Sequence, residues 1–275
     1  MNMEEWNDIV KGVARSMANE VSRYLTPISA EEEQNWGVLV GSGAYVEYKD
    51  DVFAVTNAHV LSELKGRRGG LHLKNSTSND EPASVVGINK PFGILTSPSD
   101  SAAVRVSLSA WKNEGKASSA IPYERFANRH EPVDRELLFF IGFSGERSKS
   151  LYGMLMTKGT PYTSQEPGGA AAPDYPDHEF HILYPTGLIE DLGDEQKGAP
   201  LPPGFSGSLV WNTRYVEIMQ QGGTWSPDNA VVTGILKRWI EKEELLTATK
   251  IEKAGFRGLF EAVLGDNNAI HATSA

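Results

Sequence analysis

A long series of short β-type runs, from Trp36 to Ile240, constrains the fold of this chain more than any other feature. Val, Ile, Phe and Tyr are frequent in these runs, and Gly, Pro, Asn and Asp separate them, which is typical of an all-β sandwich or barrel. Helical and strand-like segments do not alternate as they would around a parallel sheet. The sequence therefore predicts a mainly β protein. Strands are expected near residues 37–48, 52–56, 83–88, 102–107, 137–142, 151–157, 180–185, 207–211 and 230–236.

A helix is expected before this region. Apolar residues from Trp6 to Tyr24 recur at helical spacing, which predicts an amphipathic helix over residues 3–25. Pro27 lies just beyond the expected end of that helix. The run Glu31-Glu32-Glu33 is interpreted as a solvated connector to the first strand.

A second helix is expected after the β region. Residues 241–264 regain a helical spacing of apolar side chains, ahead of a tail from Gly265. The expected parts are an N-terminal amphipathic helix in 1–30, a β body in 31–240, and a C-terminal helix and tail in 241–275. Long loops are expected at 158–178 and 190–204, which are rich in Gly and Pro.

The charge balance and the lack of cysteine exclude several classes of function. The chain has 26 Lys and Arg against 36 Asp and Glu, so a formal net charge of -10 argues against partners such as nucleic acids or anionic membranes. Without cysteine, no disulfide, zinc–thiolate site or cysteine nucleophile can form. The acidic N-terminus is not a secretory signal, and no window approaches the roughly 18 apolar residues of a membrane span. We therefore expect a soluble, cytoplasmic protein.

A histidine lies at the end of the first expected hairpin, in Thr56-Asn57-Ala58-His59-Val60. A histidine held at the end of a buried strand can act as a general base, because its ordinary pKa lies near neutrality. That role requires a carboxylate that orients the imidazole and a hydroxyl that the imidazole deprotonates.

Both groups have candidates. Ser206, in Gly204-Phe205-Ser206-Gly207-Ser208, has small neighbours that let the backbone turn sharply and direct N–H groups into one concavity. Asp100 stands at the mouth of an alternating strand, whereas the competing acids Asp80 and Glu81 stand in a polar loop. The order His59, Asp100, Ser206 is that of chymotrypsin-like double barrels, and it differs from the orders in subtilisins and in α/β-hydrolases.

The chain resembles the trypsin-like serine peptidases, in particular their Deg-type bacterial and intracellular branch, over roughly residues 36–240. The matching segments are Gly41-Ser42-Gly43, residues 56–60, residues 100–104, residues 204–208 and Val232-Thr233-Gly234-Ile235. The resemblance implies a chymotrypsin-like double β-barrel with flanking N-terminal and C-terminal helices. The segment after Ile240 leaves no room for the PDZ module of that branch.

The resemblance also implies a mechanism. Ser206 attacks a peptide carbonyl, His59 transfers the proton, and Asp100 orients His59. The backbone N–H groups of Gly204 and Ser206 form the oxyanion hole, and water hydrolyses an acyl-enzyme. No metal or organic cofactor is needed, and the partner is a peptide or protein substrate.

Some residues depart from the family pattern. Pro200 stands six residues before the nucleophile, where the family often carries its primary specificity residue, so no acid is present there to attract Lys or Arg. Lys237 stands where the family commonly has a small serine near the catalytic aspartate. Lys237, Arg238 and Trp239 are candidates to line the substrate cleft and to favour an acidic or polar residue. The alternative is that they begin the C-terminal helix.

Other motifs are interpreted as structural. Ser144, in Gly142-Phe143-Ser144-Gly145, resembles a nucleophile but lacks the second glycine of G-x-S-x-G. His178 and His181 are three residues apart in a strand-like segment, so they are expected on opposite faces and not at a metal site.

The leading interpretation is an intracellular serine endopeptidase that is not specific for Lys or Arg. One alternative is a catalytically silent peptidase fold that serves as a binding or scaffold module. A third is a protease effector of a bacterial defence or stress pathway, silent until a partner remodels the loops at 158–178 and 190–204. The terminal helices are candidates for docking a regulatory protein or a second copy of the chain.

Overall fold

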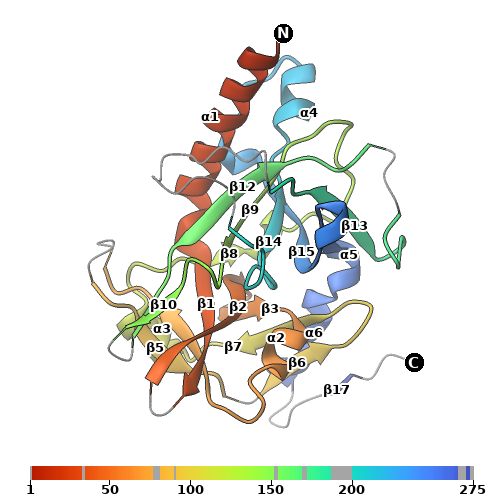
Figure 1. Cartoon of the computed structure of the whole chain (residues 1–275). Coiled ribbons are helices and arrows are strands. Elements are labelled where there is room, and N and C mark those ends of the chain that lie inside the picture. The colour runs from red at the N-terminus through yellow and green to blue at the C-terminus, as the bar shows by residue number, and fades with distance from the viewer. Residues whose placement is uncertain are drawn as a thin grey trace.

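The strands of the computed structural model form two large sheets, one above the other in the view of Figure 1. The structure describes residues 2–32, 35–76, 81–89, 91–151, 154–168, 172–186, 200–265 and 271–272. The first sheet consists of β1 (Leu25–Glu32), β2 (Asn35–Tyr48), β3 (Asp51–Thr56), β4 (Gly69–Leu73), β5 (Ser84–Gly87), β6 (Phe92–Leu95), β7 (Ser101–Arg105), β8 (Ile121–Pro122) and β17 (His271–Ala272). Its order is β17-β6-β7-β3-β2-β1-β4-β5, with β8 paired to β2.

The second sheet comes from the second half of the chain. It consists of β9 (Leu138–Phe143), β12 (Gly159–Ser164), β13 (Glu179–Leu183), β14 (Leu209–Asn212), β15 (Val231–Ile240) and β16 (Leu245–Lys250). The order is β12-β9-β14-β15-β16-β13, and every neighbouring pair is antiparallel. A separate hairpin joins β10 (Lys149–Leu151) to β11 (Met154–Met156).

Helices flank the two sheets. They are α1 (Met3–Val21), α2 (Ala58–Ser62), α3 (Leu108–Glu114), α4 (Tyr215–Gln220), α5 (Ile251–Ala254) and α6 (Phe256–Gly265), with short 3-10 turns at Ser22–Tyr24, Tyr123–Arg125, Pro227–Asn229 and Glu241–Glu243. A capping box between Asn2 and Glu5 satisfies free N–H groups at the start of α1. In Figure 1, α1 runs beside the second sheet and α6 lies against the first. No described helix is both long and apolar enough to cross a membrane.

The core has three parts. One cluster, around Tyr45 and Leu71, lies within the first sheet, which forms the first barrel of the fold. A second cluster, around Phe140 and Phe205, lies within the second sheet, which forms the second barrel. The third and largest lies between the sheets and joins residues of both to the terminal helices. It includes Phe53, Phe139, Trp211, Met17 of α1 and Phe260 of α6, all less than 2 % exposed. Both terminal helices are therefore packed into the joint core, since their apolar faces are buried there.

The mainly β fold with a helix at each end is confirmed. The connector expected at Glu31 and Glu32 is wrong, because these residues end β1, while Glu33 lies outside the described residues. Pro27 is tolerated in this strand because the pairing of β1 with β4 begins only at Ile28, so the missing N–H interrupts no ladder on that side.

Two further expectations need correction. The loop expected at 158–178 is wrong in its first part, where β12 forms an edge strand next to β9 that accommodates Pro161. The helix expected over 241–264 is wrong up to Lys250, because β16 pairs with both β13 and β15 and is buried on both faces. The sheets therefore extend beyond the expected limits of 31–240 at both ends.

Candidate active site

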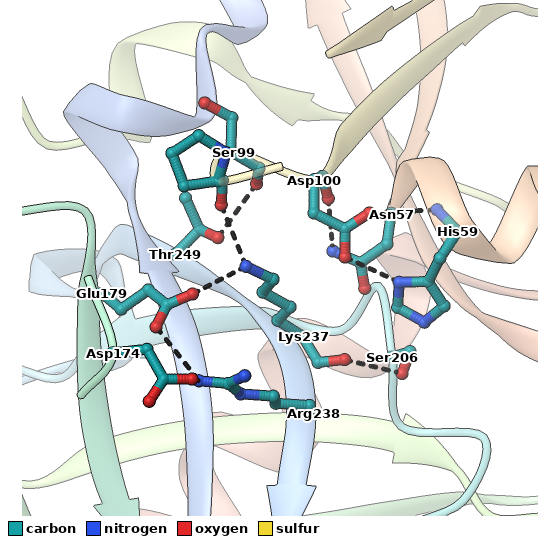
Figure 2. Close-up of polar contacts among 11 residues, drawn as sticks. Asn57, His59, Ser99, Asp100, Asp174, Glu179, Ser206, Lys237, Arg238 and Thr249 are labelled. Atoms are coloured by element: carbon teal, nitrogen blue, oxygen red, sulfur yellow. Dashed lines mark hydrogen bonds and ion pairs between the residues drawn. The ribbon is translucent and has the colours of Figure 1, made fainter. Parts of the chain in front are cut away.

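His59 is placed by the short helix α2, which begins where the buried strand β3 ends. The imidazole Nδ1 and the Asp100 carboxylate Oδ2 lie 2.6 Å apart, and the backbone N–H of His59 donates to the other carboxylate oxygen over 3.0 Å. The side chain of Asp100 is 11 % exposed and that of His59 is 37 % exposed. The carboxylate thus holds the ring at Nδ1, and the edge of the ring that carries Nε2 faces away from Asp100 (Figure 2).

Asp100 reaches this position because β7, which follows it, pairs with β3. Thr56 at the end of β3 lies opposite Ala102, so the two loops that carry His59 and Asp100 leave the same edge of the sheet. The backbone of Asp100 is left-handed, with φ 48°, a conformation in which Asp and Asn are enriched among non-glycine residues. Asn57 Nδ2 donates to the Asp100 carbonyl over 2.7 Å and secures this turn.

Ser206 comes from the other barrel, in the turn before β14. Gly207, with φ 91°, makes this turn possible, because a Cβ there would lie 2.0 Å from the Ser42 carbonyl oxygen. Figure 2 shows Ser206 beside the imidazole edge that faces away from Asp100. The Ser206 hydroxyl donates to the Lys237 carbonyl over 3.1 Å, and among the described residues the Nε2 atom of His59 has no hydrogen-bond partner.

Ser42 of β2 holds the turn that precedes Ser206 through hydrogen bonds. Ser42 Oγ donates to the Gly204 carbonyl over 2.7 Å and accepts from the Phe143 N–H over 2.8 Å. The Ser42 N–H also donates to the Ser206 carbonyl over 2.8 Å. Within the described part of the chain, the N–H groups of Gly204 and Ser206 have no partner. These two donors are available for an oxyanion.

The four residues expected to bind substrate lie in β15 and beside the serine turn. Lys237, Arg238 and Trp239 belong to β15, so the alternative that they begin a helix is wrong. The Lys237 ammonium lies 2.6 Å from Glu179 Oε1 and also donates to the Pro98 carbonyl over 3.0 Å.

The charge of Lys237 is thus compensated within the protein. Arg238 pairs with Asp174 over 2.7 Å, and Trp239 packs on the core of the second barrel. Pro200 is buried, and its carbonyl accepts a 2.7 Å hydrogen bond from Tyr184, whose burial raises the pKa of the phenol. Pro200 itself carries no acid, and among the described residues the Glu146 carboxylate lies close by, where it accepts the Leu201 N–H over 2.7 Å.

Ser144 and His181, two residues interpreted as structural, both lie inside the protein. Ser144 is buried, and its hydroxyl donates to the Leu201 carbonyl over 2.9 Å. His181 is buried in β13, where desolvation lowers the pKa of its imidazole. The described residues contain no group of three or more His, Asp or Glu side chains that could hold a metal ion. Asp80 lies outside the described residues, and Asp100 is the acid that contacts His59.

Two solved structures of low sequence identity share this architecture. Human heparin-binding protein is 12 % identical, with 91 % of this chain and 95 % of that chain covered and a TM-score of 0.51. The fold is chymotrypsin-like. An atomic-resolution structure of HBP has the same identity and coverage and a TM-score of 0.52. The Rv3671c protease of Mycobacterium tuberculosis in its active form is 16 % identical, with 94 % and 88 % covered and a TM-score of 0.49. No protein-family model and no curated protein matches the chain.

Three supporting residues were not predicted from the sequence in these roles. Asn57 holds the Asp100 carbonyl, Ser42 holds the serine turn, and Glu179 pairs with Lys237. Asn57 lies in the motif of His59, and Ser42 lies in Gly41-Ser42-Gly43, so their positions in these motifs could have indicated a role at the site. Glu179 lies between His178 and His181, far along the chain from the motifs of the catalytic residues, and the pairing of β13 with β16 brings it to the site.

Proposed function

We propose that this protein is a serine endopeptidase that cleaves peptide bonds through His59, Asp100 and Ser206. The observation that carries the proposal is the double contact between Asp100 and His59, beside a serine turn whose N–H groups are unoccupied among the described residues. The chymotrypsin-like fold supports it, since such a fold brings the histidine and the serine from different barrels to one place.

The reaction begins when the Ser206 hydroxyl turns from the Lys237 carbonyl to His59 Nε2. Oγ bonds to the substrate carbonyl carbon while its proton passes to Nε2, and the N–H groups of Gly204 and Ser206 stabilise the oxyanion. Asp100 stabilises the imidazolium. The proton then moves to the leaving amine as the C–N bond breaks, and water releases the acyl group by the same steps.

The substrate preference follows from the absence of an acid at Pro200. Pro200 itself offers no carboxylate to a Lys or Arg side chain of the substrate, so we expect cleavage after other residues. Lys237 and Arg238 are both paired with carboxylates, and Arg238 is the better candidate for contact with an acidic or polar substrate residue because its side chain is more exposed, at 37 % against 12 %. The proposal has three further parts. We propose that the protein belongs to the Deg-type branch, that it is cytoplasmic, and that a partner bound at the terminal helices can activate it.

A fluorophosphonate probe tests the activity. Intact-protein mass spectrometry should show one adduct on the wild type and none on Ser206→Ala. Ser109→Ala, which changes an exposed serine near the start of α3, should label like the wild type. A folded wild type that stays unlabelled, or Ser206→Ala labelled equally, would refute the proposal for the pure chain.

A catalytically silent binding module is the second candidate. One observation favours it: the Ser206 hydroxyl donates to the Lys237 carbonyl and not to His59. A scaffold predicts that peptides bind equally to the wild type and Ser206→Ala while neither reacts with the probe. Labelling that appears only when a partner is added would instead support the regulated protease.

A further inference from the structure

A buried group of charges lies behind the loop that carries Asp100. Glu179 of β13 is fully buried, with 0 % of its side chain exposed, and Lys237 is 12 % exposed. Glu179 Oε1 lies 2.6 Å from the Lys237 ammonium, and Glu179 Oε2 lies 3.4 Å from the Arg238 guanidinium. Arg238 in turn pairs with Asp174. Figure 2 shows these four side chains as one group, of which the Lys237 ammonium reaches toward the segment that precedes Asp100.

A β-bulge explains how two consecutive side chains reach one carboxylate. The pairing of β15 with β16 shifts register between Leu236 and Arg238, which leaves Lys237 as the extra residue. In a regular strand, Lys237 and Arg238 would point to opposite faces. The bulge re-aims them so that both contact Glu179.

The second barrel holds the Asp100 loop at two points. The Lys237 ammonium donates to the Pro98 carbonyl over 3.0 Å, and Thr249 Oγ1 donates to the Ser99 carbonyl over 2.9 Å. Asp100 itself is anchored by Asn57 and His59, which belong to the first barrel. The loop therefore lies across the junction between the barrels and depends on contacts from both.

Lys237 contacts both sides of the site. Its backbone carbonyl accepts the hydroxyl of Ser206, and its side chain holds the loop just before Asp100. A buried carboxylate such as Glu179 needs a paired cation, so the ammonium is itself held in place by Glu179.

We propose that Lys237 and Glu179 are positioning residues, which fix the Asp100 loop against the second barrel and so keep Asp100 aligned with His59. This inference rests on the proposed peptidase function for its effect on rate, but its structural part stands without it. The rival explanation is that the ion pair only stabilises the second barrel, in which case the Asp100 loop would not respond to its loss.

The test compares Lys237→Met, Lys237→Arg and Thr249→Val with the wild type in the full chain. Hydrogen exchange of residues 96–101 reports the loop, since the Asp100 N–H donates to the Thr96 carbonyl over 3.0 Å. The downfield proton NMR signal of the short His59–Asp100 hydrogen bond reports the alignment. Fluorophosphonate acylation reports the rate.

In Lys237→Met we expect exchange of residues 96–101 to be at least about tenfold faster and the downfield signal to broaden or vanish. Acylation should slow by roughly tenfold to 100-fold, the usual cost of a misplacement near 1 Å. Lys237→Arg should keep loop exchange, the downfield signal and the acylation rate close to those of the wild type. Thr249→Val should change the same three quantities as Lys237→Met does, but by less. Lys49→Met removes the exposed Lys49–Glu261 pair and should change none of them.

A folded Lys237→Met with unchanged exchange and an unchanged downfield signal would overturn the proposal. If Lys237→Met unfolds because Glu179 is left unpaired, Lys237→Met with Glu179→Gln leaves no buried charge and should show the same loosened loop. If the double variant also unfolds, Thr249→Val provides the test, because it changes no charge. Unchanged hydrogen exchange of residues 96–101 in Thr249→Val would then contradict the proposal. An unlabelled wild type whose loop still responds to Lys237→Met would refute the peptidase and support the positioning role.

Discussion

One carboxylate makes two contacts at the candidate active site. Asp100 Oδ2 lies beside the His59 imidazole, and Oδ1 accepts the His59 backbone N–H. The ring is therefore held in position and in one tautomer, with its proton on Nδ1, because an ionised carboxylate can only accept. This arrangement leaves Nε2 free to accept a proton from the serine hydroxyl.

Asp100→Asn should test that arrangement. An amide in place of the carboxylate can donate to Nδ1 and then favours the wrong tautomer, so we expect acylation at neutral pH to slow by roughly 10³–10⁴-fold. Stability should change little in comparison, since the shape of the side chain is kept. Asp134→Asn, at a side chain that is 97 % exposed, is the matched control and should label normally. Equal rates for both variants would contradict a catalytic Asp100.

The residues that bear chemistry could be predicted from the sequence because they lie in short motifs whose order is informative. The contacts that support them could not. Asn57 contacts the backbone of Asp100, and Glu179 meets Lys237 only through pairing of distant strands. Such contacts depend on sheet register and on a bulge, which leave no local signal in the sequence.

Helix α1 shows at the scale of one element how a terminal segment becomes part of the core. Its buried residues Val13, Met17 and Val21 follow helical spacing and belong to the cluster between the sheets. Arg125 links the helix to the second half of the chain, since it pairs with Glu20 of α1 and donates to the Pro227 carbonyl. The opposite face, with Gly12, is exposed.

Substitutions on the two faces of α1 should have opposite effects on the free energy of unfolding. Gly12→Ala meets no atom within 4 Å and should stabilise the protein by about 0.5–1 kcal/mol, because alanine is the better helix former. Met17→Ala removes a fully buried side chain and should cost about 2–5 kcal/mol. Urea denaturation of both variants measures the difference. A destabilised Gly12→Ala would show that α1 is not helical at that position.

Element types were predictable where a segment is strongly periodic, as in α1 and β2. They were not predictable where tertiary pairing overrides the local pattern. β16, Leu-Leu-Thr-Ala-Thr-Lys, is too short to show its own period, and Leu245 fits a helical series of apolar positions with Ile251 and the residues from Phe256 onward. Its pairing with β13 and β15 makes it a strand.

At the scale of the whole molecule, buried histidines couple folding to pH. His72 of β4 is buried beside Ser29, 2.8 Å from its hydroxyl, and burial lowers the pKa of the imidazole from 6.5 to about 4. Burial also lowers the pKa of His181 in the second barrel. Both histidines are therefore neutral in the folded protein at a pH where an unfolded chain would be protonated.

Stability should fall as the solution is acidified through this window. Above about pH 6.5 His72 is neutral in both states and has no effect; below it the unfolded chain binds the proton first, until the folded protein also binds it near pH 4. Between pH 6.5 and pH 4 the free energy of unfolding should therefore fall by about 3 kcal/mol for a fully buried imidazole. Urea denaturation between pH 4 and pH 8 should show this decline, and His72→Gln should flatten it by the share that His72 contributes. An identical pH slope in His72→Gln would place the acid sensitivity elsewhere, because a glutamine at this position cannot take up a proton.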